Sequence, residues 1–211
     1  VCVDNGANTS ATFSNCIFRG NVALQGDGMG GSGYGAGMWI NLAAAGTARV
    51  VNCTFTANTN LLGHGGAIAL SSGTLILKNS ILWSNNVAAA YTGKELYRNG
   101  GTLRVDYCAL TGTNEPMVTG EAALSNVITK DPLFAGATDL HLQSARGRWN
   151  PETAEWTKDT LTSPAIDAGD PADPVGMELE PNRRVINLGA YGGTVEASLS
   201  FFPRGAVFTG W

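Results

Sequence analysis

A short segment recurs along the first half of the chain, and its recurrence restricts the possible folds more than any other feature. The clearest copy is residues 49–58, and related copies occupy residues 11–21 and 75–85. A weaker fourth copy occupies residues 103–113. Recurrence with a period of about 20 to 50 residues is typical of solenoids, propellers and repeat arrays.

Aligning the four copies places chemically similar residues in columns. There is a column of Asn, a column of Cys or Ser, a column of large apolar residues, and a second Asn column that ends in Thr. In chain order the columns are Asn15, Asn52 and Asn79; Cys16, Cys53, Ser80 and Cys108; Phe18, Phe55, Leu82 and Leu110; and Asn21, Asn58, Asn85 and Thr113.

A second apolar segment precedes each copy, and a glycine-containing turn joins the two. The clearest examples are residues 37–40 and 67–70, which are followed by turns at Gly46 and Gly73. The aligned Cys and Ser positions lie 37, 27 and 28 residues apart, so the first unit contains an insertion, the glycine-rich run 26–35. Each unit is therefore predicted to be a strand, a tight turn, a strand and a looser connection.

The stacking of like residues favours a parallel β-helix over a propeller. In a parallel β-helix each residue lies about 4.8 Å above its equivalent, so identical residues form ladders. Asn side chains at a bend can then hydrogen-bond to the Asn above and below, while Cys, Phe and Leu fill the interior. A propeller blade needs four comparable strands in each repeat, and these units do not show four. The predicted fold is an all-β, single-stranded parallel β-helix.

The repeats also resemble those of a family of bacterial surface proteins. Gly-Gly-Ala-Ile at 65–68 and the Phe-x-x-Asn pattern at 18–21 and 55–58 are similar to the repeat of the polymorphic outer membrane proteins. They are similar, too, to repeats of other bacterial right-handed parallel β-helix surface proteins. The resemblance covers residues 1–113 and implies a right-handed solenoid that is secreted or on the cell surface.

The sequence after residue 113 resembles another element of such proteins. Its motifs are Asp-Pro-Leu-Phe at 131–134, Asp-Leu-His-Leu at 139–142, Ser-Pro-Ala-Ile-Asp-Ala-Gly-Asp at 163–170 and Asn-Leu-Gly-Ala-Tyr-Gly-Gly at 187–193. This series is similar to the C-terminal closing segment of secreted β-helix proteins, which is often found before a cell-surface anchor. The resemblance implies an irregular cap, because an open β-helix end exposes backbone donors and apolar rungs.

Three regions are therefore expected. Residues 1–113 form β-helix coils, residues 114–199 form the last coil and the cap, and residues 200–211 form an apolar tail or a linker. Two Trp residues flank an Asn-Pro turn within the cap, which predicts a hairpin near residues 146–160. Because the sequence starts in what looks like half of a repeat, we expect further coils upstream.

Composition and charge argue against two classes of protein. The chain has 211 residues, of which 44% are hydrophobic and only 14% charged. It has no run of about 18 apolar residues, the length that a membrane span requires. Residues 1–113 hold six Lys or Arg and four acids, and residues 114–211 hold seven and thirteen. Neither part has the basic density of a nucleic-acid-binding protein.

The cysteines and the acidic residues are candidates for covalent and metal chemistry. Cys16 and Cys53 fall on adjacent coils, but their parallel Cβ directions make a disulfide awkward, so buried thiols are favoured. Cys108 lies too far along the stack to pair with Cys53.

The sequence requires no cofactor. An acidic loop is a candidate Ca²⁺ site, although Arg183 and Arg184 lie beside it and are alternative partners for its carboxylates. The candidate Ca²⁺ ligands are Asp167, Asp170, Asp173, Glu178 and Glu180.

Five residues are candidates for contact with a glycan. Trp83 falls between an apolar column and an Asn column, on a side expected to face outward, and flat apolar sugar faces favour aromatic rings. Arg49, Lys78 and Arg104 lie on the second strands and predict a modest basic strip for an acidic glycan. His64 lies in a glycine-rich loop. The alternative is that all five are solvated or packed side chains. Other aromatic residues that could add to a sugar-stacking face are Trp39, Tyr34, Tyr91 and Tyr97.

Three functions are consistent with these patterns. The first is a secreted or cell-surface bacterial module that acts as a structural, adhesive or glycan-binding scaffold for a polysaccharide or cell-envelope glycan. The second is the C-terminal part of a polysaccharide lyase or glycoside hydrolase. An inverting hydrolase needs two carboxylates about 6.5–9.5 Å apart, and the acids of residues 1–113 fall at unmatched positions. The third is a surface-fibre subunit that self-associates end to end. The first function is favoured.

Overall fold

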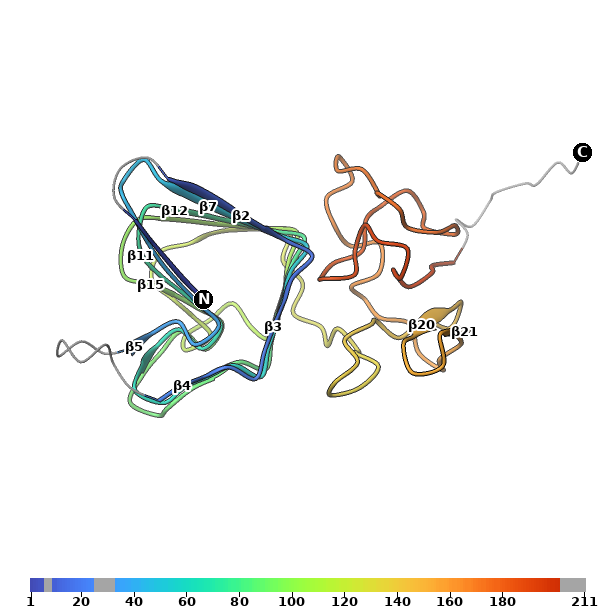
Figure 1. Ribbon diagram of the computed structural model, residues 1–211, viewed down its shortest axis with the longest axis horizontal. Coiled ribbons are helices and arrows are strands. Elements are labelled where there is room, and N and C mark those ends of the chain that lie inside the picture. Colours follow the sequence, from blue (N-terminus) through green and yellow to red (C-terminus); the bar gives the residue numbers. More distant parts are fainter. Residues whose placement is uncertain (6–8, 25–32, 202–211) are drawn as a thin grey trace, which may run out of the picture.

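The chain folds into parallel sheets and loops. The structure is a computed structural model that describes residues 1–5, 9–24 and 33–201, and no helix occurs among them. Successive passes of the chain stack on one another, and a second region with few strands lies beside the stack (Figure 1). The prediction of an all-β fold is confirmed, and the stacking is compatible with a β-helix-like solenoid. Residues 6–8, residues 25–32, which include most of the predicted insertion, and residues 202–211 of the predicted tail lie outside the described residues.

Three parallel sheets form the main walls of the stack, and strands from successive passes are neighbours in each. Sheet A contains β1 (Cys2–Asn5), β6 (Met38–Leu42), β11 (Ile68–Ser72), β15 (Leu96–Arg98) and β18 (Val118–Thr119). Sheet B contains β2 (Ser10–Ser14), β7 (Thr47–Val51), β12 (Thr74–Lys78), β16 (Thr102–Asp106) and β19 (Ala123–Ser125). Sheet C contains β3 (Ile17–Arg19), β8 (Thr54–Thr56), β13 (Ile81–Trp83) and β17 (Ala109–Leu110).

Two smaller parallel sheets complete the wall. One contains β4 (Val22–Ala23), β9 (Thr59–Asn60) and β14 (Asn86–Val87), and the other contains β5 (Gly33–Tyr34) and β10 (Gly63–His64). Beyond residue 113, parallel pairing continues through β18 and β19, and an isolated bridge joins Ala109 to Ile128. We call the described residues up to 128 the coil stack and residues 129–201 the C-terminal region.

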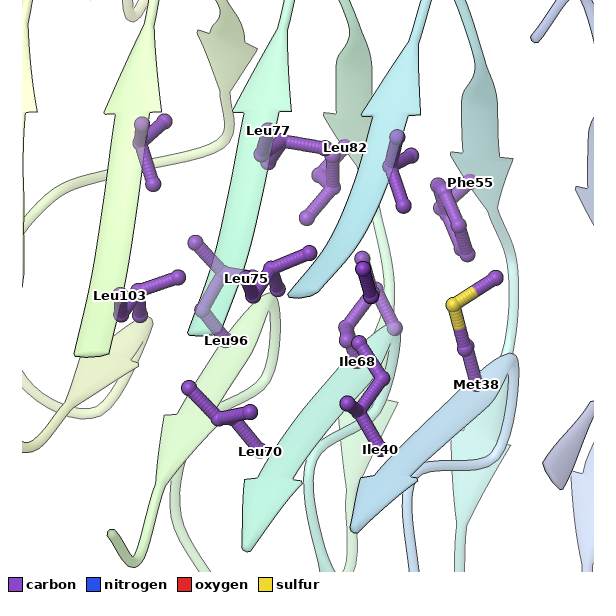
Figure 2. Packing of buried hydrophobic residues seen from close by; sticks show 14 of the residues in the cluster. Met38, Ile40, Phe55, Ile68, Leu70, Leu75, Leu77, Leu82, Leu96 and Leu103 are labelled. Atoms are coloured by element: carbon purple, nitrogen blue, oxygen red, sulfur yellow. The ribbon is translucent and has the colours of Figure 1, made fainter. Parts of the chain in front are cut away.

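The interior of the coil stack is apolar and filled from sheets A, B and C (Figure 2). On β7, Ala48 and Val50 are buried while Arg49 between them is exposed, as the alternation of a strand requires. The register pairs Phe18 with Phe55, Phe55 with Leu82 and Leu82 with Leu110, which is the apolar column of the repeat alignment. The Phe18 and Phe55 rings stack with their centroids 4.3 Å apart.

The first Asn column forms the bend between sheets B and C. Asn15, Asn52 and Asn79 have φ angles of 51°, 48° and 48°, a left-handed conformation that Asn adopts more readily than most residues. Their side chains do not hydrogen-bond to one another; each amide donates to the C-terminal region instead. These bonds join Asn15 Nδ2 to Ala190 O (3.0 Å), Asn52 Nδ2 to Asn187 O (3.0 Å) and Asn79 Nδ2 to Asp173 Oδ2 (2.8 Å).

The second Asn column forms the hydrogen-bonded ladder that the repeat predicts. Asn21 Nδ2 donates to Asn58 Oδ1 (2.7 Å), and Asn58 Nδ2 donates to Asn85 Oδ1 (2.8 Å). The next pass has Thr at this position, and the ladder ends on Glu95, whose Oε2 accepts a bond of 2.6 Å from Asn85 Nδ2. Glu95 is fully buried, and this burial raises the pKa of its carboxyl group.

The C-terminal region lies along the side of the coil stack (Figure 1), which corrects the interpretation of this region as an end cap. Its contacts reach three successive passes through the first Asn column. The physical reason is the outward face of sheet C, where Ile81 and Ala109 would be exposed apolar residues. Both are buried against Leu142, Ile166 and Leu188. Gly192 lies at this contact, where an added Cβ would collide with Asn187 O and Asn52 Nδ2.

Side-chain contacts organise the C-terminal region. The strands β20 (Arg148–Asn150) and β21 (Glu155–Thr157) form an antiparallel hairpin with Trp149 opposite Trp156, at the position where the sequence predicts one. His141, in the Asp-Leu-His-Leu motif, is one of the buried polar residues of this region. Its side chain is 1% exposed, its ring stacks on Tyr191 at 3.6 Å between centroids, and its Nε2 lies 3.2 Å from Glu196 Oε2.

All four cysteines are free thiols in the structure. Cys53 and Cys108 lie fully buried in the column predicted for them, and Cys16 is half-buried. Burial raises the pKa of both the Cys53 and the Cys108 thiol to about 12. These two side chains therefore act as small apolar core residues at neutral pH.

Candidate functional site

A groove lies where the outer face of sheet C meets the first loop of the C-terminal region. The wall of the groove on the stack side is formed by Trp83, at the end of β13. Trp83 is in register with Thr56 on the neighbouring strand, and Thr56 is in register with Arg19 on the strand beyond it. Leu82 points into the core, so strand alternation directs Trp83 outward. Trp83 is half-buried because it packs against the apolar cluster that joins the two regions.

The opposite wall of the groove is the loop 131–143. Arg19 Nη1 donates a hydrogen bond of 2.8 Å to Ala137 O, which holds this loop against the stack. Asp131 Oδ1 accepts from the backbone N of Leu133 (2.8 Å), and Gln143 Nε2 donates to Phe134 O (3.1 Å). These two hydrogen bonds leave a second carboxylate oxygen on Asp131 and the side-chain amide oxygen on Gln143.

The hollow between these walls has a volume of about 460 Å³. Its apolar lining comes from Trp83, Leu133, Phe134 and Leu140, and its polar lining includes Asp131 and Gln143. Ligand pockets typically span about 300–1,000 Å³ and combine aromatic walls with a few polar groups that orient the ligand. The groove therefore suits a small molecule or a chain segment with flat apolar faces and hydroxyl groups.

The structure brings the three predicted basic residues to one hollow of about 380 Å³ on the outer face of sheet B. Arg49 and Arg104 share a column with Ile76 between them. Lys78 Nζ lies 2.8 Å from both Asp170 Oδ2 and Asp173 Oδ1. Asp106 lines the same hollow and is the strand neighbour of Lys78. The charge here is therefore mixed, which suits an acidic glycan less well than a purely basic strip.

His64 lies in an aromatic cluster at the opposite side of the stack. Its ring stacks on Tyr97 at 4.3 Å between centroids and meets Tyr91 edge-on at 5.2 Å, while Tyr34 stacks on Tyr97 at 6.0 Å. The backbone N–H of Thr92 donates to His64 Nδ1 (3.1 Å), which places the ring proton of a neutral imidazole on Nε2. His64 lies on β10 in the sheet with β5, on another side of the stack from sheet C (Figure 1), so the five glycan candidates do not form one site.

The five acidic metal candidates are divided among different partners. Asp170 and Asp173 pair with Lys78, while Arg183 Nε lies 3.9 Å from Asp167 Oδ2. Glu178 is buried and Glu180 is exposed. In the described parts of the chain, no three His, Cys, Asp or Glu side chains gather as a metal site.

Sequence reasoning found Trp83 but missed Asp131, Phe134 and Gln143. No sequence signal connects these residues to Trp83, because they approach it only when the C-terminal region docks on sheet C. The repeat alignment extends to residue 113, and the loop lies outside its register.

The geometry defines an all-β protein with stacked parallel sheets and a groove at a junction between two regions. The sequence matches no protein-family model, no curated protein and no solved structure in comparisons with each. No helix in the described ranges is long and apolar enough to cross a membrane.

Proposed function

We propose that this protein is a secreted or cell-surface glycan-binding scaffold built on a right-handed parallel β-helix. The β-helix part of the proposal is supported by the repeated parallel pairing of equivalent residues in sheets A, B and C. The glycan part rests on one observation, the groove in which Trp83 and Phe134 lie with Asp131 and Gln143.

The groove favours a neutral glycan over an acidic one. Aromatic rings provide stacking surface for the C–H faces of sugars, and a carboxylate and an amide accept or donate hydrogen bonds to hydroxyl groups. Asp131 is an acidic residue and disfavours a uronate or sulfate beside it. The same lining supports binding over hydrolysis, because hydrolysis of glycosides usually uses a pair of carboxylates and the groove is lined by one.

Affinity electrophoresis on a panel of neutral and acidic polysaccharides tests the proposal. We expect at least one neutral polysaccharide to retard the protein without being shortened. Trp83→Ala removes the stacking ring and weakens binding roughly tenfold, which corresponds to about 1.4 kcal/mol. Trp156→Ala, in the hairpin and outside the groove, is the matched control and leaves binding unchanged.

A second variant keeps the test independent of folding, because Trp83 also packs on an apolar cluster. Gly136 lines the groove, is exposed, and has open space where a Cβ would be. Gly136→Trp therefore fills the groove without disturbing packing and abolishes retardation, whereas Thr138→Trp, on the same loop outside the groove, does not. Absence of retardation across the panel, or unchanged binding by Gly136→Trp, overturns the proposal.

A further inference from the structure

Two residues with buried carboxyl groups, Asp167 and Glu178, are connected through Asn187 in the C-terminal region. The Asp167 side chain is 8% exposed and Glu178 is 7% exposed. Asn187 connects them, since its backbone N donates to Glu178 Oε1 (2.8 Å) and its Oδ1 accepts from the backbone N of Asp167 (2.8 Å). The backbone N of Gly193 also donates to Glu178 Oε1 (2.8 Å). Two backbone N–H groups thus fix the Glu178 carboxyl group, and the Asn187 side chain fixes the backbone of Asp167.

One oxygen of each carboxyl group lacks a partner. Asp167 Oδ1 and Glu178 Oε2 are buried and accept no hydrogen bond from any described residue. A buried, ionised oxygen without a donor or a counter-charge is costly, so native proteins rarely leave one, and here two occur together. The Glu178 carboxyl group is held at its other oxygen by two backbone N–H groups, so its unpartnered oxygen has a fixed position.

The surrounding charges compensate the pair only in part. Burial raises the pKa of Asp167 to about 6, and the Ser200 hydroxyl and Arg183 guanidinium offset some of this rise. Arg183 lies 3.9 Å from the other Asp167 oxygen and its side chain is 56% exposed, so solvent screens it. Burial raises the pKa of Glu178 to about 7, and the negative charge of Asp167 adds to the rise. The pair therefore has a deficit of positive charge at neutral pH.

We propose that Asp167 Oδ1 and Glu178 Oε2 together bind a hard divalent cation, with Ca²⁺ as the probe. Carboxylate oxygens are preferred ligands of Ca²⁺, and backbone carbonyl or hydroxyl oxygens complete its coordination in many proteins. The cation would join the segment around residue 167 to the one around residue 178 and so stabilise the fold of the C-terminal region. This proposal is independent of glycan binding.

Isothermal titration of the chelator-treated full chain with CaCl₂ at pH 7.5, together with thermal unfolding, tests the site. We expect saturable binding of one Ca²⁺ and a rise in Tm of roughly 5–10 °C at a hundredfold excess over Kd. Glu178→Gln keeps an oxygen for the Asn187 and Gly193 donors but removes the charge, so it abolishes both effects. Glu152→Gln, at an exposed acid in the turn of the hairpin, is the control and retains both.

Two results would overturn the proposal. One is a wild-type protein that neither binds Ca²⁺ nor gains Tm, because the pair then holds no cation. The other is equal Ca²⁺ binding by the wild type and Glu178→Gln, which would place the ion elsewhere. A Tm rise with MgCl₂ as well as CaCl₂ supports a hard-cation site of low selectivity.

Discussion

The coil stack and the C-terminal region are held together in different ways. In the stack, parallel backbone ladders join every pass to the next, and equivalent apolar residues meet in columns. In the C-terminal region the only paired strands among the described residues are those of one hairpin, and its order comes from side chains bonded to distant backbone groups. Contacts that recur on every pass can therefore be made by different residues of similar character. Each contact of the C-terminal region occurs once and depends on one particular residue.

The largest effect is expected in the core of the stack. Phe55 is fully buried and stacks on Phe18, so Phe55→Ala should lower the free energy of unfolding by about 3–5 kcal/mol. Urea denaturation measures the loss. Phe201→Ala in the C-terminal region removes a ring that is 52% exposed and should change the free energy by no more than about 0.5 kcal/mol. Similar losses in the two variants would contradict the assignment of the stack as the stable core.

Asn79 tests the junction between the two regions. Asn79→Ala places a residue without a polar side chain in a left-handed bend and removes the hydrogen bonds with Asp173 and with the backbone N of Asp170, at a cost of about 2–4 kcal/mol. Asn79→Gly keeps the bend and loses only the hydrogen bonds, so its cost should be smaller. Hydrogen exchange should accelerate in residues 165–192 of both variants. Unchanged exchange there would contradict the docking role of the Asn column.

The buried acids predict a pH dependence of stability, to which Glu178 in the C-terminal region and Glu95 in the coil stack both contribute. The pKa of Glu178 is raised from 4.5 to about 7, so between these values the folded protein holds a proton that the unfolded chain has released. Without divalent cations, the free energy of unfolding should therefore fall by about 2–3 kcal/mol as the pH rises from 4.5 to 7. Denaturation in chelator across this range measures it. Asp167, whose pKa is raised to about 6, adds to this fall, so Glu178→Gln should make the curve shallower without flattening it, and an unchanged slope in this variant would assign the dependence to other groups.

The smallest effect concerns the ion pairs of Lys78. Its side chain is 26% exposed and those of Asp170 and Asp173 are 17% and 28% exposed, so Lys78→Met should cost only about 1 kcal/mol. The cost should shrink in 1 M salt, because screening already weakens the pairs of the wild type. Arg49→Met, on a neighbouring pass of the same sheet, is the control and should be nearly neutral. A larger loss for Arg49→Met would show that the Lys78 pairs do not hold the two regions together.

The same contrast explains how much could be predicted from the sequence. Repetition revealed the columns, so the repeat pattern alone was enough to place Phe55 inward and Trp83 outward. It could not reveal that Asn52 binds the backbone of Asn187, because the two residues are 135 positions apart and nothing in the local pattern connects them. Glu95 likewise ends the Asn ladder, from the position just before β15 where the preceding pass has Ala67, and the Asn columns gave no indication of this. The groove combines both kinds of residue, so only its Trp83 side was predictable.

Hydrogen exchange with and without the polysaccharide retained in the panel tests the central claim most directly. The claim is that the glycan binds in the groove between sheet C and the loop 131–143. We expect exchange to slow on both walls together, in residues 82–84 and 131–143, with little change around His64 and Tyr97. Slowing on one wall alone, or only at the aromatic cluster around His64, would contradict the account.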